Sequence, residues 1–133
     1  MRHALLALGH LWAAPTTALG LLLALSTGAR WLLCGRDGHL VMAGTSRPWR
    51  WWSSRWGMAA VTIGAVTICA GRTSARLFRH ERRHQRQALI LGPLYLPIYV
   101  LLCAYGPLHG GHWYRDHPLE LDARAAEGDA CPS

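Results

Sequence analysis

Two histidines one helical turn apart are the feature of this sequence that most constrains its fold. The run from Thr73 to Leu91 is predicted to be a single helix, because capping residues precede it and Gly92-Pro93 ends it. His80 and His84 then lie on one face, so both imidazoles can point at the same metal ion. Glu81 follows the first histidine, where its carboxylate can reach a water molecule held on that ion.

These three residues form the HExxH pattern, in which the histidines bind zinc and the glutamate acts as a general base. A hydrolytic zinc site needs a third protein ligand and an open position for water. An acidic segment lies downstream, from Tyr114 to Arg124, with Glu120 at its centre. The sequence therefore predicts a zinc site whose third ligand is still to be supplied by another part of the chain.

The two segments together resemble zincin metallopeptidases whose third ligand is a glutamate in an ExxA helix. The matching residues are His80-Glu81-x-x-His84-x-x-Gln87 and Glu120-x-x-Ala123. The chain is also similar to a group of small bacterial membrane proteins that carry HERxHxRQ, GPLxxPxY and YRDxPxExxA, here at residues 80–87, 92–99 and 114–123. The resemblance implies a minimal zincin-like domain that acts on a peptide or protein substrate, with zinc held by His80, His84 and Glu120.

Further polar residues near the two motifs are candidates for supporting roles. His117 and Tyr114 could donate hydrogen bonds to an oxyanion, because acyl-transfer sites place donors where negative charge develops. A second group could hold a metal-bound imidazole in its correct tautomer, namely Asp116, Asp122 and Gln87. The related ExxAD pattern has an aspartate after the alanine, where this chain has Arg124. Residues 127–133 are predicted to be a frayed end.

An uncharged N-terminal stretch predicts membrane attachment. Residues 3–29 carry no charge unless a histidine is protonated, and they exceed the roughly 20 residues that cross a bilayer. We predict a membrane anchor over residues 1–34, kinked at Pro15, with a cleaved secretory signal as the alternative. Arginines are more frequent after the anchor than before it, so the positive-inside rule places the metal site on the cytoplasmic side of a bacterial inner membrane.

A second apolar stretch, residues 88–108, is interrupted by three breaks. Gly92-Pro93, Pro97 and Gly106-Pro107 divide it into short pieces. If Glu120 binds the same ion as the histidines, the chain cannot end on the opposite side of the membrane. We therefore predict a hairpin or broken helix that packs on the N-terminal helix or dips into one leaflet.

The middle of the chain favours β structure. A turn at Asp37-Gly38 precedes a short strand over His39 to Ala43. Trp56 to Gly71 is free of charge and rich in Val, Ile and Thr, which favours a buried strand or hairpin. With the helices on either side, the predicted fold class is α+β, and residues 35–133 are predicted to form one domain.

Arginine and tryptophan dominate the predicted surface. All 14 basic residues are arginine and the formal net charge is +7, which favours an anionic partner. Membrane lipid fits better than nucleic acid, because no stacking platform or helix-turn-helix pattern is present. The tryptophan-rich segment 49–56 suits the membrane–water boundary, or else covers the core. An arginine stripe on the motif helix is expected to be solvated or to face phosphate, and comprises Arg72, Arg76, Arg79, Arg83 and Arg86.

Two functions are consistent with these features. The first is a membrane-associated zinc metallopeptidase in which zinc-activated water attacks a peptide carbonyl and Glu81 takes its proton. The alternative is a non-catalytic small membrane protein with a structural or vestigial zinc site that docks on anionic lipid or a protein partner. A closed, structural site would need a fourth protein ligand such as His117. The sequence carries no signal for an oligomeric state.

Overall fold

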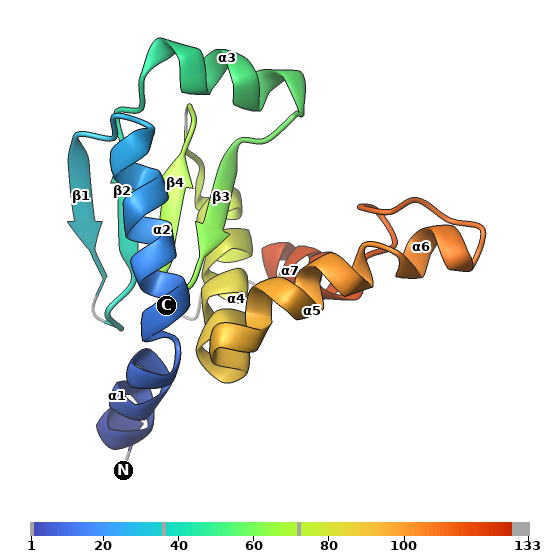
Figure 1. The fold of residues 1–133 in the computed structure, drawn as a ribbon, viewed down its shortest axis with the longest axis horizontal. Coiled ribbons are helices and arrows are strands. Elements are labelled where there is room, and N and C mark those ends of the chain that lie inside the picture. Colours follow the sequence, from blue (N-terminus) through green and yellow to red (C-terminus); the bar gives the residue numbers. More distant parts are fainter. Residues whose placement is uncertain (1, 36, 72, 129–133) are drawn as a thin grey trace.

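The computed structural model describes residues 2–35, 37–71 and 73–128 and has an α+β architecture (Figure 1). The predicted fold class is therefore confirmed. The elements in chain order are α1 (Arg2–Trp12), α2 (Ala14–Ser26), β1 (Trp31–Cys34), β2 (Leu40–Ala43), α3 (Arg47–Arg55), β3 (Ala60–Ile63), β4 (Val66–Cys69), α4 (Ala75–Leu91), the 3₁₀ turn η1 (Gly92–Leu94), α5 (Tyr95–Leu102), α6 (Tyr105–Leu108) and α7 (Pro118–Gly128).

A four-stranded mixed sheet in the order β1-β2-β4-β3 forms the centre of the fold. The run from Trp56 to Gly71, predicted to be a buried strand or a hairpin, forms the antiparallel hairpin of β3 and β4, and β2 matches the strand predicted at His39 to Ala43. β1 pairs antiparallel with β2, while β2 and β4 run parallel. Because side chains alternate along a strand, the sheet presents two chemically different faces.

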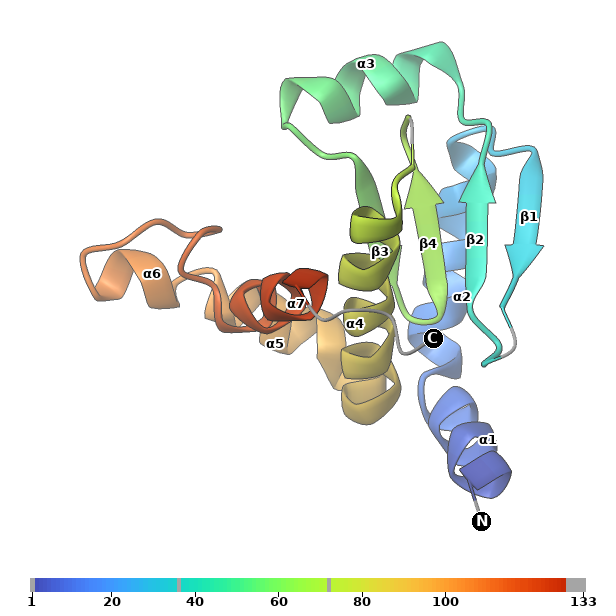
Figure 2. The same ribbon diagram turned by 180° about the vertical axis from the view of Figure 1, so that it is seen from behind.

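Helices cover both faces of the sheet, α2 on one side and α4 on the other (Figures 1 and 2). The α2 face is apolar, with Met42, Val66 and Ile68 packed against Ala24. The α4 face is polar: Thr62 and Thr67 are cross-strand neighbours whose hydroxyls lie 2.7 Å apart. A polar sheet face can be buried only when its groups find partners, and α4 supplies them.

A glycine allows α2 to lie directly on the sheet. A Cβ atom at Gly20 would lie 2.4 Å from the Ile63 carbonyl oxygen and 3.0 Å from the Val66 Cβ atom. We expect Gly20→Val to lower the free energy of unfolding by about 1–3 kcal/mol, because overpacking forces the helix off the sheet. Thermal unfolding in detergent measures this, with Gly71→Val as the control because nothing lies within 4 Å of its Cβ position. Equal melting temperatures for the two variants would contradict the expectation.

The motif helix forms close to the predicted bounds. The Ser74 hydroxyl accepts a hydrogen bond from the Leu77 backbone N–H at 3.1 Å, which caps the start of α4. The helix ends at Gly92, whose φ of +57° is unfavourable for residues with a side chain. A side chain at this position would also collide with the Trp12 indole, so the end of α4 is fixed against the N-terminal helices.

Residues 88–108 form a broken helix, one of the two predicted arrangements. The last turn of α4 leads through η1 into α5 and α6, which extend away from the sheet, and α7 then returns alongside α5 to pack on α4 (Figures 1 and 2). The N-terminal helices contact the start of this segment, because the Thr16 hydroxyl donates to the Gly92 carbonyl at 3.5 Å. This path brings the C-terminal acidic segment back to the motif helix.

The N-terminal helices share the core of the domain. α1 and α2 are bent by 66° relative to each other at Ala13, and Pro15 lies in the first turn of α2. Within the described residues, Ala75–Leu108 is long and apolar enough to cross a membrane, and the bent α1–α2 pair passes the same test only if counted as one span. Membrane insertion and signal cleavage remain predictions.

The tryptophan-rich segment forms a helix that the sequence had not predicted. In α3, Trp51, Trp52 and neighbouring Trp56 are exposed, whereas Trp49 packs against the core cluster. Trp49 and Trp52 are in contact, with ring centroids 5.2 Å apart and ring planes tilted by 33°. One tryptophan therefore covers the core and the others form an aromatic surface at one end of the sheet.

Candidate metal centre

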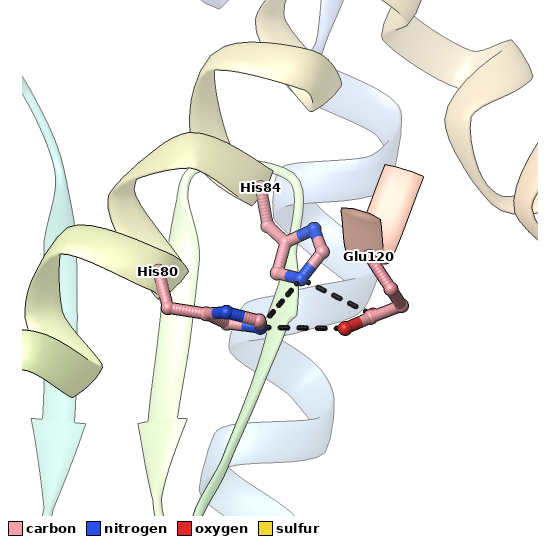
Figure 3. A group of neighbouring side chains, drawn as sticks. All are labelled: His80, His84 and Glu120. Carbon is pink, nitrogen blue, oxygen red and sulfur yellow. Dashed lines mark hydrogen bonds and ion pairs between the residues drawn. The ribbon is translucent and has the colours of Figure 1, made fainter. Parts of the chain in front are cut away.

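Three side chains from two helices converge at the interface of α4 and α7. The Nε2 atoms of His80 and His84 lie 3.1 Å apart, and they lie 3.4 Å and 3.2 Å from the two carboxylate oxygens of Glu120 (Figure 3). All three residues are buried, with exposed fractions of 8%, 5% and 3%. The chain thus brings together the three residues that the sequence predicted as zinc ligands.

The spacing of these atoms fits a tetrahedral ion. Ligands at about 2.0–2.1 Å from zinc in a tetrahedron are about 3.3–3.4 Å from one another, by geometry. The two imidazole nitrogens lie 3.1 Å apart, and each lies 3.2 or 3.4 Å from a different oxygen of the Glu120 carboxylate, which is close to this value. Nitrogen, nitrogen and carboxylate oxygen also form a donor set used by hydrolytic zinc sites. The three residues could therefore hold a metal ion.

The outer hydrogen bonds of the histidines direct their lone pairs inward. The Gln87 amide nitrogen donates to the Leu119 carbonyl at 3.0 Å and to the Asp122 carboxylate at 2.7 Å. Its oxygen therefore faces His84 Nδ1, 2.9 Å away, and can only accept. The Nδ1 atom of His84 must carry the proton, which leaves Nε2 free to bind a metal ion.

His80 is oriented in the same way by Glu127, an acid that belongs to neither predicted motif. Its Nδ1 atom lies 2.9 Å from the Glu127 carboxylate, which also forms an ion pair with Arg76. The expectation that residues 127–133 form a frayed end is wrong for Glu127, which belongs to α7, while 129–133 lie outside the described residues. Glu127 follows Glu120 by seven residues and so shares its helical face, a signal that could have identified it.

The supporting network has a testable consequence for metal affinity. We expect Gln87→Leu to weaken zinc binding about 10- to 100-fold, because His84 loses the acceptor that fixes its tautomer. Competition with a chromophoric chelator measures the change. Arg86→Leu, at an exposed position one residue earlier, is the matched control and should bind zinc like the wild type. Equal affinities for the two variants would contradict the role assigned to Gln87.

Glu120 is ionised and has an unsatisfied oxygen. Burial would raise the pKa of its carboxyl, but the adjacent His80 and His84 imidazoles and the hydrogen bond from Tyr99 hold that pKa well below its usual range. The Tyr99 hydroxyl donates to Oε1 at 2.6 Å, whereas the buried Oε2 has no hydrogen-bond partner. A buried carboxylate oxygen without a donor is costly, and a metal ion at this position would satisfy it.

His80 carries a proton readily in the same environment. Burial lowers its pKa, but this is outweighed by Glu120, Glu81 and Glu127, and the net pKa is raised above its ordinary value. A proton and a metal ion therefore compete for the same position among these carboxylates.

Glu81 lies on the sheet side of α4, beside the two histidines. Its buried carboxylate accepts a hydrogen bond from the Thr62 hydroxyl at 2.6 Å. Burial raises its pKa, only partly opposed by Thr62 and the nearby histidines. Glu81 also forms part of the wall of a cavity of about 460 Å³ between α4 and the strands β1, β2 and β4. The predicted general base thus adjoins both the imidazoles and an open space.

The predicted oxyanion donors occupy different environments. His117 is fully buried, and both of its ring nitrogens are engaged: Nε2 lies 2.9 Å from the Tyr99 carbonyl and Nδ1 accepts from the Leu119 N–H at 3.2 Å. This arrangement joins α5 to α7 and leaves no nitrogen for an oxyanion or a metal. Tyr114 is 40% exposed, and its partial burial together with the Glu120 carboxylate raises its pKa to about 12.

The predicted supporting carboxylates also differ in position. Asp122 acts on His84 only through Gln87 and is held by both guanidinium nitrogens of Arg83, at 2.7 and 2.8 Å. Asp116 instead accepts a bond from the His112 backbone N–H, within the loop before α7, so no contact joins it to the imidazoles. Gln87 is the predicted residue that touches a ligand directly.

Arg124, at the position of the aspartate in ExxAD, has a structural role. Its guanidinium donates to the Glu120 carbonyl at 3.3 Å and to the Tyr114 carbonyl at 3.2 Å, and also to the Arg115 carbonyl. These bonds tie the loop before α7 to the helix that carries the third ligand. Arg124 therefore stabilises the backbone around Glu120 and so helps to fix the position of this residue.

The arginine stripe of α4 is partly solvated, as expected, and partly held in ion pairs: the Arg76 side chain is 76% exposed, whereas Arg79 and Arg83 are half-buried. Arg76 and Arg79 bond to Glu127, and Arg83 bonds to Asp122, so these arginines fasten α4 to α7. The acidic residues of α7 explain the difference, since they neutralise a stripe that would otherwise repel itself. Arg86 is exposed, and Arg72 lies outside the described residues.

Within the described residues, His80, His84 and Glu120 are the group of histidine, cysteine, aspartate and glutamate side chains placed to share one ion. With His117 engaged elsewhere, no fourth side-chain ligand of these types joins them there. No protein-family model, curated protein or solved structure matches this chain. The likeness to zincin peptidases therefore rests on the motif residues and on the geometry they adopt.

Proposed function

We propose that this protein is a membrane-associated zinc metallopeptidase. The observation that carries the proposal is the convergence of two imidazole lone pairs and one carboxylate at 3.1–3.4 Å, with Glu81 beside them. Three protein ligands without a fourth side chain are typical of catalytic zinc sites, in which water takes the remaining position. Zinc is favoured over harder ions such as Mg²⁺ because two of the three donors are imidazole nitrogens.

The chain's own residues can supply the proton transfers of peptide hydrolysis. When bound, zinc lowers the pKa of a coordinated water to about 7 and polarises a carbonyl group. The Glu81 carboxylate accepts the proton of the attacking water and passes it to the amine nitrogen of the broken peptide bond. Its raised pKa suits this task, because a base works best with a pKa near the operating pH. Tyr114 keeps its proton at neutral pH and can donate to the developing oxyanion.

Hydrolysis of an unfolded protein substrate in detergent tests the proposal. We expect new amino termini to appear with zinc-loaded protein, to stop after chelation, and to return after zinc is added back. The chelated sample is the control for activity that does not depend on zinc, and the reloaded sample is the control for damage caused by chelation. An absence of new termini over a broad set of unfolded substrates, with zinc bound, would contradict peptidase activity.

The membrane location is also part of the proposal. It is supported by the uncharged stretches at 3–29 and 87–114 and by the apolar segment within Ala75–Leu108. By the positive-inside rule, the metal site faces the cytoplasm of a bacterial cell. The substrate would then be a peptide or protein segment close to the membrane surface.

A structural or vestigial zinc site is the second candidate, and the burial of all three ligands favours it. Such a protein would dock on anionic lipid or a protein partner without catalysis. Cobalt substitution distinguishes the two, because a catalytic site keeps an exchangeable water whereas a closed site does not. A cobalt spectrum that is unchanged by added azide would favour the structural site.

A further inference from the structure

We propose that α1, α2 and α5 lie in the plane of the membrane, embedded in one leaflet, and that the chain does not cross the bilayer. This inference rests on the membrane location in the proposed function and makes it specific.

The N-terminal helices expose leucines that no other part of the described chain covers. Exposed large apolar side chains recur at intervals of three along both helices, at Leu5, Leu8, Leu11, Leu19, Leu22 and Leu25. Leu22, for example, has an exposed fraction of 64%. Contiguous apolar patches of this kind mark sites of membrane or protein contact.

The α5 region repeats this pattern. Tyr95 and Tyr99 lie on one side of α5 and point into the fold, where Tyr99 reaches the Glu120 carboxylate. The opposite side exposes Val100 and Leu101, the latter with an exposed fraction of 73%, and Leu94 of η1 is exposed beside them. One side of α5 therefore covers the metal site, and the other presents apolar side chains to the surroundings.

α2 and α5 lie on the same broad face of the molecule. In Figure 1, viewed down the shortest axis, α2 lies in front of the sheet and α5 in front of α7. Figure 2 shows the reverse order from behind, with the sheet in front of α2 and α7 in front of α5. The axes of both helices lie roughly in the plane of these views and not along the line of sight. A flat lipid surface can therefore contact both at once.

The helices are too short, and too firmly packed, to cross. The 11 residues of α1 and the 13 of α2 span about 16 Å and about 20 Å at 1.5 Å per residue, whereas the hydrocarbon core is about 30 Å thick. A bend of 66° separates them. Ala75–Leu108 is longer, but the chain turns between α4, which packs on the sheet, and α5 (Figure 1), so α5 and α6 together, residues 95–108, span only about 21 Å at 1.5 Å per residue. α2 also lies directly on the sheet through Gly20, so upright insertion would draw the open edges of the sheet into lipid.

Lipid fits this face better than a protein partner. The face is built from two chain segments, 3–29 and 87–114, that lack charged residues, whereas protein interfaces usually have a polar rim that fixes register. Arg30 is exposed just beyond α2, where a guanidinium can meet phosphate, and the net charge of +7 favours anionic headgroups. Apolar side chains of helices that lie in the interface are buried about 5–10 Å into the boundary between headgroups and acyl chains.

Site-specific labelling tests the topology directly. One reporter cysteine replaces His3, Ser54 or Ala125, all exposed, in a full-length background with Cys34, Cys103 and Cys131 changed to serine. Cys69 is kept, because it is buried and out of reach of the label. A membrane-impermeant maleimide is added to sealed inner-membrane vesicles of either orientation. We expect all three positions to be labelled from the cytoplasmic side only. Labelling of His3→Cys alone, or of Ala125→Cys alone, from the other side would indicate one span, and labelling of Ser54→Cys alone would indicate two spans; any of these results overturns the proposal.

Vesicle flotation tests the surface itself. The purified chain is mixed with vesicles of phosphatidylcholine and phosphatidylglycerol at 3:1, with pure phosphatidylcholine for comparison. We expect the double variant Leu22→Glu, Leu101→Glu to lose at least tenfold in vesicle binding, while Leu121→Glu, an exposed leucine of α7, binds like the wild type. Equal binding of both would overturn the proposal. Zinc content is measured on the same samples. A wild type that contains zinc but does not bind vesicles would refute the proposed membrane surface without contradicting the metal site.

Discussion

Glu81→Gln is expected to lower peptide hydrolysis about 10²- to 10⁴-fold while zinc remains bound, because an amide cannot take the proton of the attacking water. The side chain keeps its size, and its oxygen can still accept the bond from the Thr62 hydroxyl. The measurement is the hydrolysis rate together with the zinc content of the same preparation. Arg82→Gln, one residue later on the exposed side of α4, should retain activity and is the matched control.

The same substitution is expected to leave folding intact. Because burial raises the pKa of Glu81, the folded state disfavours its ionised form, so removing the charge should maintain or raise the free energy of unfolding near neutral pH. The raised pKa also moves the acidic limb of the pH–rate profile above the range of an ordinary glutamate, about 4.3. If Glu81→Gln kept full activity with zinc bound, Glu81 would not be the base and the mechanism would be wrong.

His84→Ala is expected to weaken zinc binding by more than the roughly 100-fold that loss of a supporting residue causes, because it removes a ligand. Zinc at about 100 times its dissociation constant stabilises the wild type by about 2.7 kcal/mol, and this gain should be absent from the variant. Thermal unfolding with and without zinc measures the difference. Arg86→Ala, on the exposed side of the same turn, is the control. A zinc-dependent rise in melting temperature that persists in His84→Ala would contradict the ligand assignment.

The parts of the fold that depend on local sequence were predictable. The bounds of α4 follow from a capping serine and from Gly92, and β2 and the β3–β4 hairpin follow from β-branched residues between turns. The ligand triad was predictable because the spacing of His80 and His84 is a property of one helix. Glu120 was identified by its motif. The return of the chain to α4 was predicted from the glycine and proline breaks in residues 88–108.

The parts that depend on tertiary packing were not predictable in the same way. Tyr99 and Glu127 contact the site only because α5 leaves α4 at an angle and α7 returns beside it, which no local pattern encodes. The inward turn of His117 has the same origin. An apolar run such as residues 3–29 is similar in sequence whether it meets lipid or a sheet, so the packing of α2 through Gly20 could not be distinguished from an anchor.

The zinc content of the purified full-length chain, measured by elemental analysis beside Glu120→Ala, tests most directly whether one ion joins the two ends of this domain. The geometry predicts one zinc per chain in the wild type and a loss of most of it in the variant, because Glu120 alone reaches both imidazoles from α7. A wild type that binds no zinc when it is supplied, or a variant that binds as much as the wild type, would contradict the account.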